Sequence, residues 1–164
     1  ILEPGAALAS DVMCFAAKVI ARKRVRTREI ALVAGSIHNI KPTLHAKQLP
    51  MRVLRAADGP DGRADNAPVD VVGYTCMEHD CLYRGYAGAL RPGDFVVFDN
   101  VGAYTVVMKP PFIRPAPAIL VRDGNNSFAL AKRAERFDDL FGAFDFPEAR
   151  QAAPIRMPPK VMRS

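Results

Sequence analysis

Along most of the chain, apolar residues alternate with polar ones over short stretches that turn-forming residues separate. This period of two, in stretches rich in valine, isoleucine and phenylalanine, predicts short β-strands. Strands are expected at 28–34, 51–56, 69–75, 95–98, 104–108, 116–122 and 127–132, with a less regular one at 15–25. Many short strands joined by turns predict a mainly β fold, either a β-sandwich or a barrel.

Helical patterns are few and short. Residues 6–14 are helix-prone, residues 133–141 form a short amphipathic pattern, and residues 80–90 are expected to hold a short helical turn. The segment 36–48 is polar and irregular, because Pro42 blocks a long helix. The segment 57–68, with its Asp-Gly-Pro-Asp-Gly run, is expected to be a surface loop.

Turn-forming residues between the later strands predict which of these strands pair. The run Arg91-Pro92-Gly93-Asp94 has proline at the second and glycine at the third position, which is typical of a type II turn. Strands 95–98 and 104–108 are expected to form a hairpin across 99–102. A second hairpin is expected between 116–122 and 127–132, across Asp-Gly-Asn-Asn.

Length and composition limit the functional classes. The 164 residues suit one domain, or one domain and part of another, and 49% hydrophobic residues suffice for a core. The net charge of +6 is attributed to surface lysine and arginine, and the cluster at 22–26 to a solvated strand end or turn. No aromatics interleave with it, so no nucleic-acid partner is expected. Because no run is apolar enough for a membrane span or a signal peptide, we expect no membrane partner and a reducing cytoplasm.

The three cysteines, Cys14, Cys76 and Cys81, do not indicate a disulfide framework, because the chain is too large to need one. His79 lies near two of them, but no second pair of ligands completes a tetrahedral zinc site. We therefore expect no metal.

Three short motifs hold the residues best suited to chemistry: Gly73-x-x-Cys76-x-x-x-Asp80, Leu90-x-x-Gly93-Asp94 and Gly102-Ala103-Tyr104. A thiol with a pKa near neutral suits proton donation, although a free cysteine is commonly only a small buried apolar residue. Asp80 could equally cap a helix that begins at the next residue. A strand tyrosine often does no more than cover its sheet.

In this order and at these spacings, the motifs resemble the C-terminal β-domain of the fold-type III, pyridoxal phosphate (PLP)-dependent decarboxylases, the ornithine, diaminopimelate and arginine decarboxylase family. Glu3-Pro4-Gly5 resembles the family's Glu-Pro-Gly-Arg motif on the last strand of its barrel. The resemblance implies an alanine racemase-like architecture. Residues 1–27 would be the end of the PLP-binding barrel, 28–146 the β-domain and 147–164 an extended or flexible tail.

The resemblance also implies roles for individual residues. Glu3 would pair with the pyridine nitrogen of PLP, while the Gly5 backbone and the Tyr104 hydroxyl would contact its phosphate. Cys76 would donate a proton to the active site of the other subunit of a homodimer, and Asp80 would support it. The family's phosphate-binding arginine is replaced here by Ala6, which removes one contact.

The implied reaction is α-decarboxylation of an amino acid through an external aldimine, by a carbon–carbon lyase. The Schiff-base lysine and the N-terminal barrel segment are not in this chain, so the chain alone is expected to be inactive. Met77 stands where family members that act on diamino acids place a carboxylate, and Glu78 would point to the opposite side of an extended backbone. The substrate is therefore expected to lack a distal ammonium group, or to be linked to a carrier.

Two other interpretations stay open at this point. A catalytically inactive homologue could work as a binding or regulatory protein, which Ala6 and Met77 favour and the three intact site residues oppose. A racemase or dehydratase on the same scaffold fits the cysteine segment less well. His38, His45 and His79 are interpreted as surface or satisfied histidines, and Phe112 and Pro115 match a family segment only in their packing.

Overall fold

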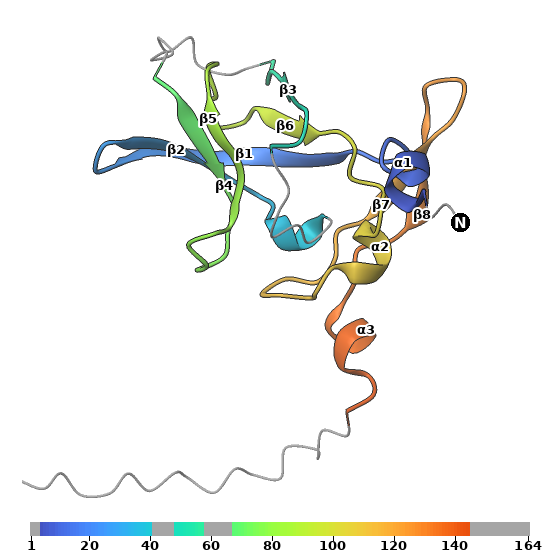
Figure 1. The fold of residues 1–164 in the computed structure, drawn as a ribbon. Helices are drawn as coiled ribbons and strands as arrows, with labels where there is room; N and C mark the ends of the chain where they lie inside the picture. The colour runs from blue at the N-terminus through green and yellow to red at the C-terminus, as the bar shows by residue number, and fades with distance from the viewer. Residues whose placement is uncertain (1–3, 41–47, 58–66, 145–164) are drawn as a thin grey trace, which may run out of the picture.

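The computed structural model describes residues 4–40, 48–57 and 67–144, and these form a mainly β fold (Figure 1). The elements in chain order are α1 (Gly5–Ala9), β1 (Phe15–Val25), β2 (Arg28–Val33), the 3-10 helix η1 (Ile37–Asn39), β3 (Met51–Leu54), β4 (Val69–Val72), β5 (Cys81–Tyr86), β6 (Phe95–Phe98), α2 (Thr105–Met108), β7 (Ile119–Arg122), β8 (Phe128–Lys132) and α3 (Phe137–Phe141). The expected mainly β class is confirmed. Within the described residues, no helix has the length and apolar character that crossing a membrane requires.

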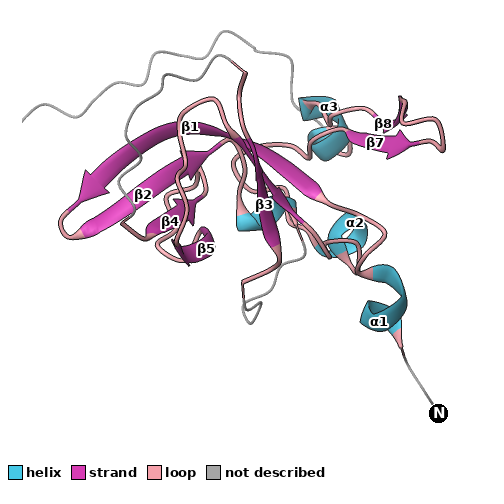
Figure 2. Cartoon of the chain, turned by 90° about the horizontal axis from the view of Figure 1, so that it is seen from above, coloured by secondary structure: helices cyan, strands magenta, loops and turns pink. Residues whose placement is uncertain are grey.

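Six of the strands form one sheet in the order β3-β6-β1-β2-β4-β5. Only β2 and β4 run parallel, and the other neighbours are antiparallel. The long strand β1 pairs with β6 through residues 15–18 and with β2 from Val19 onward, with a shift in register between Val19 and Ala21. Such an irregularity bends a strand, and Figure 2 shows β1 as a long curved ribbon across the sheet. The sheet is therefore curled.

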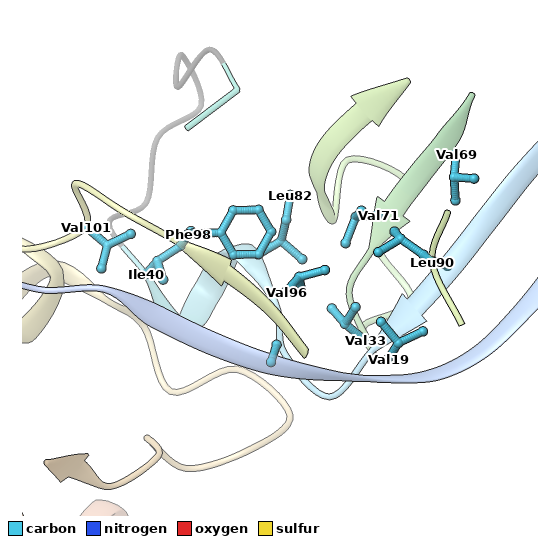
Figure 3. Packing of buried hydrophobic residues seen from close by; sticks show 12 residues of the cluster. Val19, Val33, Ile40, Val69, Val71, Leu82, Leu90, Val96, Phe98 and Val101 are labelled. Atoms are coloured by element: carbon cyan, nitrogen blue, oxygen red, sulfur yellow. The ribbon is translucent and has the colours of Figure 1, made fainter. Parts of the chain in front are cut away.

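The core lies on the inner face of this curled sheet. Because neighbouring side chains of a strand point to opposite faces, alternate positions are buried, as with Ala17 and Val19 of β1 and Val69 and Val71 of β4. Figure 3 shows side chains from β1, β2, β4, β5 and β6 meeting in one cluster. The buried positions of β4, and Ala17 and Val19 in β1, are therefore every second residue of their strands.

The second predicted hairpin and the predicted turn are confirmed. Strands β7 and β8 pair as an antiparallel hairpin apart from the main sheet. In the turn, the Asp94 N–H donates to the Arg91 carbonyl at 3.1 Å, and Gly93 has a φ of 98°. A type II turn needs a positive φ at this position, which glycine adopts without strain. The basic cluster at 22–26 lies at the end of β1 and in the turn that follows, as expected.

The first predicted hairpin is wrong, because residues 105–108 form the helix α2 and not a strand. Strand β6 already pairs with β1 on one side and β3 on the other, so it has no free edge for a following strand. Asn100 and Tyr104 adopt φ angles of 61° and 64°, in the left-handed region, so the backbone between β6 and α2 does not continue as a strand.

The helical turn predicted within 80–90 is also wrong. Residues 81–86 form β5, which pairs with the edge of β4. Leu82 is buried in the core while Arg84 is exposed. Tertiary pairing has therefore decided the structure of a segment whose local pattern was ambiguous.

At the N-terminus, β1 pairs with both β2 and β6, so it joins the predicted segments 1–27 and 28–146 in one sheet. The division at residues 27 and 28 stays a prediction. The helices α1 and α3 are shorter than the patterns at 6–14 and 133–141 indicated. The predicted tail at 147–164 and most of the predicted loop at 57–68 lie outside the described residues.

Candidate functional site

Two of the residues predicted to bind the cofactor lie against each other. Gly5 is the first residue of α1, and Tyr104 directly precedes α2. A Cβ atom added to Gly5 would lie only 2.9 Å from the Tyr104 hydroxyl oxygen and 3.7 Å from Cζ. The absence of a side chain at Gly5 therefore lets the phenol hydroxyl approach the backbone at the start of α1.

The segment before Tyr104 is fastened beside α1. The Gly102 N–H donates to the Ser10 carbonyl at 2.9 Å, and the Val101 N–H donates to the Met13 carbonyl at 3.2 Å. A Cβ on Gly102 would lie 2.1 Å from the Ala9 carbonyl oxygen, so only glycine fits this approach. The close approach at Gly102 thus holds the segment that carries Tyr104 beside α1, where Tyr104 lies against Gly5.

This arrangement fits the phosphate group of PLP. Phosphate is bound through donors such as hydroxyl and backbone N–H groups, on backbone that glycine leaves open to close approach. The Tyr104 side chain supplies a hydroxyl and is 48% exposed, and it lies next to the backbone of Gly5, which has no side chain. Glu3, predicted to pair with the pyridine nitrogen, lies outside the described residues. Within the described ranges, no group of three or more His, Cys, Asp or Glu side chains could hold a metal ion.

Asp80 organises the second predicted group, on the loop 73–80 that joins β4 to β5. Its carboxylate is 3% exposed and accepts three hydrogen bonds, from the Ile37 N–H (2.9 Å), the Thr75 N–H (3.0 Å) and the Thr75 hydroxyl (2.6 Å). A Cβ on Gly73 would lie 2.2 Å from Asp80 Oδ2. Asp80 therefore fills the space above a glycine and holds the loop. It precedes a strand and does not cap a helix.

The loop contacts a short turn around η1. Two side chains close this turn: Ser36 Oγ accepts from the His38 N–H, and Asn39 Oδ1 accepts from the Ser36 N–H. Tyr74 joins the loop to the turn at two points, through its N–H to the Gly35 carbonyl (3.1 Å) and its hydroxyl to Asn39 Oδ1 (3.2 Å). The loop thus has fixed partners in a segment far from it in sequence.

The Cys76 side chain is exposed on this loop. The three cysteines differ in their environments: Cys14 is also exposed, whereas Cys81 is partly buried and donates to the Tyr83 carbonyl at 3.4 Å. Burial raises the pKa of the Cys81 thiol, although the nearby Arg84 guanidinium opposes this. Cys81 therefore keeps its proton and is suited to packing, whereas Cys76 is open to a reacting molecule.

Sequence reasoning missed the contacts that surround the loop. His38 Nε2 lies 3.2 Å from Met77 Sδ, and the His38 ring centroid lies 5.1 Å from that of Phe112. The Arg114 guanidinium lies over the Tyr74 ring at 4.9 Å. Nothing in the local sequence signals these contacts, because they join residues about 40 to 75 positions apart. His79 is exposed, and His45 lies outside the described residues.

The two groups of predicted site residues are not brought together within one chain. Figures 1 and 2 agree in placing β4 and β5, which flank the Cys76 loop, on the opposite side of the structure from α1. Gly5 and Tyr104 thus form one group, and Cys76 and Asp80 form another.

Comparison with known proteins gives one match to a family model. Residues 7–102 match the model described as "Pyridoxal-dependent decarboxylase, C-terminal sheet domain". This range covers more than half of the chain and includes both Cys76 and Asp80, while Gly5 and Tyr104 lie just outside its two ends.

Among curated proteins, the chain is 27% identical over 147 residues to the L-glutamyl-[BtrI acyl-carrier protein] decarboxylase of Niallia circulans, covering 85% of the chain and 34% of that protein. It is 30% identical over 150 residues to a probable chloroplastic diaminopimelate decarboxylase of Oryza sativa subsp. japonica, covering 88% of the chain and 29% of that protein. The chain thus spans about a third of the length of the relatives it matches.

Solved structures share the fold. Diaminopimelate decarboxylase from Helicobacter pylori, complexed with L-lysine, superposes with a TM-score of 0.70 at 22% identity, over 85% of this chain and 34% of that one. The diaminopimelate decarboxylase of M. jannaschii gives a TM-score of 0.73 at 16% identity, over 87% and 32%. The curled sheet is therefore an architecture already seen in decarboxylases.

Proposed function

The chain belongs to the pyridoxal-dependent decarboxylase family, whose C-terminal sheet domain it matches. From this we propose that it supplies part of the active site of a PLP-dependent amino-acid decarboxylase. The observation that carries the proposal is the close approach of the Tyr104 hydroxyl to Gly5. A glycine and a hydroxyl, contributed by segments almost 100 residues apart, make a small polar site that fits a phosphate group.

In this proposal the Tyr104 hydroxyl and the Gly5 backbone hold the phosphate of PLP, and Glu3 pairs with its pyridine nitrogen. Bound PLP supplies an electron-accepting ring that takes up the electron pair released when carbon dioxide leaves the substrate. The lysine that anchors the cofactor would come from a barrel segment outside this chain. Because Ala6 cannot replace an arginine, Tyr104 bears more of the phosphate binding.

Cys76 is proposed as the acid that returns a proton to the substrate carbon after decarboxylation. A thiol can donate a proton near neutral pH when it is exposed to the reacting atom and held in place. Exposure of Cys76 supports this role, as does the fixed loop around it. Asp80 is proposed as a positioning residue, because all three of its hydrogen bonds hold the loop.

The separation of the two groups of residues supports a homodimer with shared active sites. Each site would take Gly5 and Tyr104 from one protomer and Cys76 from its partner. Exposed apolar side chains on α2 and on the β7–β8 hairpin support a further contact with the barrel segment. They are Val106, Val107, Met108, Leu120, Val121, Phe128 and Leu130.

The proposed substrate is an α-amino acid without a distal ammonium group, free or linked to a carrier. Met77 follows Cys76 with an uncharged thioether, and the buried Asp80 carboxylate is already occupied by three donors. The relative from Niallia circulans bears the name of a decarboxylase of a glutamyl group on a carrier protein, which is consistent with this class. The proposed reaction is that of a carbon–carbon lyase, in the cytoplasm.

Carbon dioxide release by the full-length protein tests the proposal, with glutamate, carrier-linked glutamate, lysine, ornithine, arginine and diaminopimelate as candidate substrates. The variant Cys76→Ala should keep bound PLP and lose about 10²-fold or more in kcat, because it lacks the proton donor. Cys14→Ala, which removes another exposed thiol, is the matched control and should keep its activity. Equal activity of the two variants, or no release from any substrate by the wild type, would refute the proposal.

A further inference from the structure

His38 of η1 contacts Met77, the residue that directly follows Cys76 on the loop 73–80. Its Nε2 atom lies 3.2 Å from the sulfur of Met77, the residue that follows Cys76. A thioether sulfur can only accept a hydrogen bond, so this contact is a hydrogen bond in the tautomer that carries a proton on Nε2. The contact joins two residues 39 positions apart in the sequence.

Two other contacts fix the position of His38, one of its backbone and one of its ring. The His38 backbone lies in η1, where its N–H donates to Ser36 Oγ at 3.2 Å. On its side-chain end, the ring packs against Phe112 with centroids 5.1 Å apart and an interplanar angle of 55°. A donor whose position is set by packing and by a second hydrogen bond holds its acceptor more precisely than a free side chain does.

Cys76 depends on its two neighbours for its position. In the described part of the chain, no hydrogen bond is made by the Cys76 thiol. Thr75, on one side, is held by Asp80 through both its N–H and its hydroxyl. Met77, on the other side, is held by His38, and its N–H also reaches Thr75 Oγ1 at 3.4 Å. The loop is therefore clamped immediately before and immediately after the cysteine.

We propose that His38 is a positioning residue for Cys76, acting through its hydrogen bond to Met77. Asp80 holds the backbone on both sides of the cysteine, through the Thr75 N–H before it and, after it, through its own N–H, which donates to the Met77 carbonyl at 2.9 Å. His38 adds a hold on the Met77 side chain. Only the turnover measurement rests on the proposed decarboxylase function, because the conformation of the loop can be measured without it.

Three variants of the full-length protein separate the hydrogen bond from the shape of the ring. His38→Gln keeps a side-chain donor, His38→Phe keeps a ring against Phe112 without a donor, and Met77→Leu removes the acceptor at similar volume. We expect His38→Phe and Met77→Leu each to lower kcat about tenfold with KM within about twofold, because misplacing a catalytic group slows the chemical step. His38→Gln should retain most of the wild-type kcat, and the double variant should be no slower than either single one.

The conformation of the loop provides the second measurement. Amide hydrogen exchange at residues 75–78 should be several-fold faster in His38→Phe than in the wild type. Alkylation of Cys76 should change in the same variant, with the exposed Cys14 of the same molecule as the internal reference. The His38→Gln variant should behave as the wild type in both measurements.

The outcomes distinguish this inference from the proposed function. Unchanged exchange and alkylation in His38→Phe would overturn the clamp, whatever the activity. Equal losses of kcat in His38→Gln and His38→Phe, or additive losses in the double variant, would also overturn it. A wild-type protein that releases no carbon dioxide, together with faster exchange in His38→Phe, would refute the decarboxylase and retain the clamp.

Discussion

The backbone N–H of Ile37 donates a 2.9 Å hydrogen bond to the Asp80 carboxylate, across a separation of 43 residues. Through this bond, the turn that follows β2 fixes the end of the loop that carries Cys76. The parallel pairing of β2 and β4 brings the two segments together, because both strands end at the same edge of the sheet. Asp80 holds Thr75, the residue before the cysteine, and its own carboxylate is buried.

Replacing Asp80 by alanine should lower the free energy of unfolding by about 3 kcal/mol, because two N–H groups and a hydroxyl lose their acceptor in a buried place. Urea denaturation of the full-length protein measures this change. Asp99→Ala is the control, since Asp99 pairs with Arg52 at a largely exposed position and should cost less than about 1 kcal/mol. Equal losses in the two variants would contradict the role of Asp80.

Gly73 should tolerate no side chain. Its Cβ would lie 2.2 Å from Asp80 Oδ2, within a carboxylate that three hydrogen bonds hold in place. Gly73→Ala should therefore lower the free energy of unfolding by about 2 kcal/mol through overpacking. Gly124→Ala, where a Cβ meets nothing within 4 Å, should change it by less than about 0.5 kcal/mol. Thermal denaturation of both variants checks the difference, and a neutral Gly73→Ala would refute this packing.

Asp94 should contribute to the acid sensitivity of the fold. Burial by itself raises the pKa of this carboxyl, but the N–H groups of Ala56 and Arg91 and the Arg55 guanidinium outweigh burial and lower the pKa from its ordinary value. A carboxyl with a lowered pKa in the folded state stabilises the protein fully above its unfolded pKa of about 3.9. That stabilisation is lost as the pH falls through the lower folded value.

We therefore expect the wild type to lose stability more steeply than Asp94→Asn as the pH falls below about 4. The free energy of unfolding of both proteins, measured from pH 7 down to pH 3, checks this prediction. Parallel curves for the two proteins would show that the hydrogen bonds to Asp94 do not favour its charged form.

Shared active sites predict complementation between inactive variants. Tyr104→Ala should lack the cofactor contact and Cys76→Ala the proton donor, so each homodimer should be nearly inactive. Mixed dimers would place both substitutions in one site and leave the other site intact, restoring roughly a quarter of the wild-type activity at random exchange of subunits. Carbon dioxide release before and after the variants are dissociated and reassociated together measures this recovery. No recovery, despite mixed dimers detected by mass spectrometry, would contradict sites shared between protomers.

The sequence predicted the parts of the fold that local pattern determines. The strands expected at 95–98 and within 69–75 form as β6 and β4, and the Pro-Gly step at 92–93 forms the expected turn. The left-handed backbone at Tyr104 was not predictable, because tyrosine has no preference for that conformation. The strand at 81–86 depends on the free edge of β4, which only the assembled sheet reveals.

The residue types of the candidate site followed from the motifs, but their arrangement did not. Gly5 and Tyr104 were predicted to bind one group, and the structure places them in contact. Asp80 was predicted as a catalytic partner of Cys76, whereas its hydrogen bonds show how it holds the loop. The contact between His38 and Met77 had no sequence signal, because it arises where η1 meets the loop 73–80, which lies far from it in the sequence.

Titration of the full-length protein with PLP, followed by visible absorption, tests whether Gly5 and Tyr104 bind the cofactor. We expect a cofactor absorption band that saturates and is abolished by borohydride. The apparent Kd should rise about tenfold in Tyr104→Phe, which loses the hydroxyl beside Gly5, and stay unchanged in Tyr83→Phe, a control tyrosine on β5. If saturating PLP gives no band with the wild type, or if Tyr104→Phe binds as tightly, the Gly5–Tyr104 site is not a cofactor site.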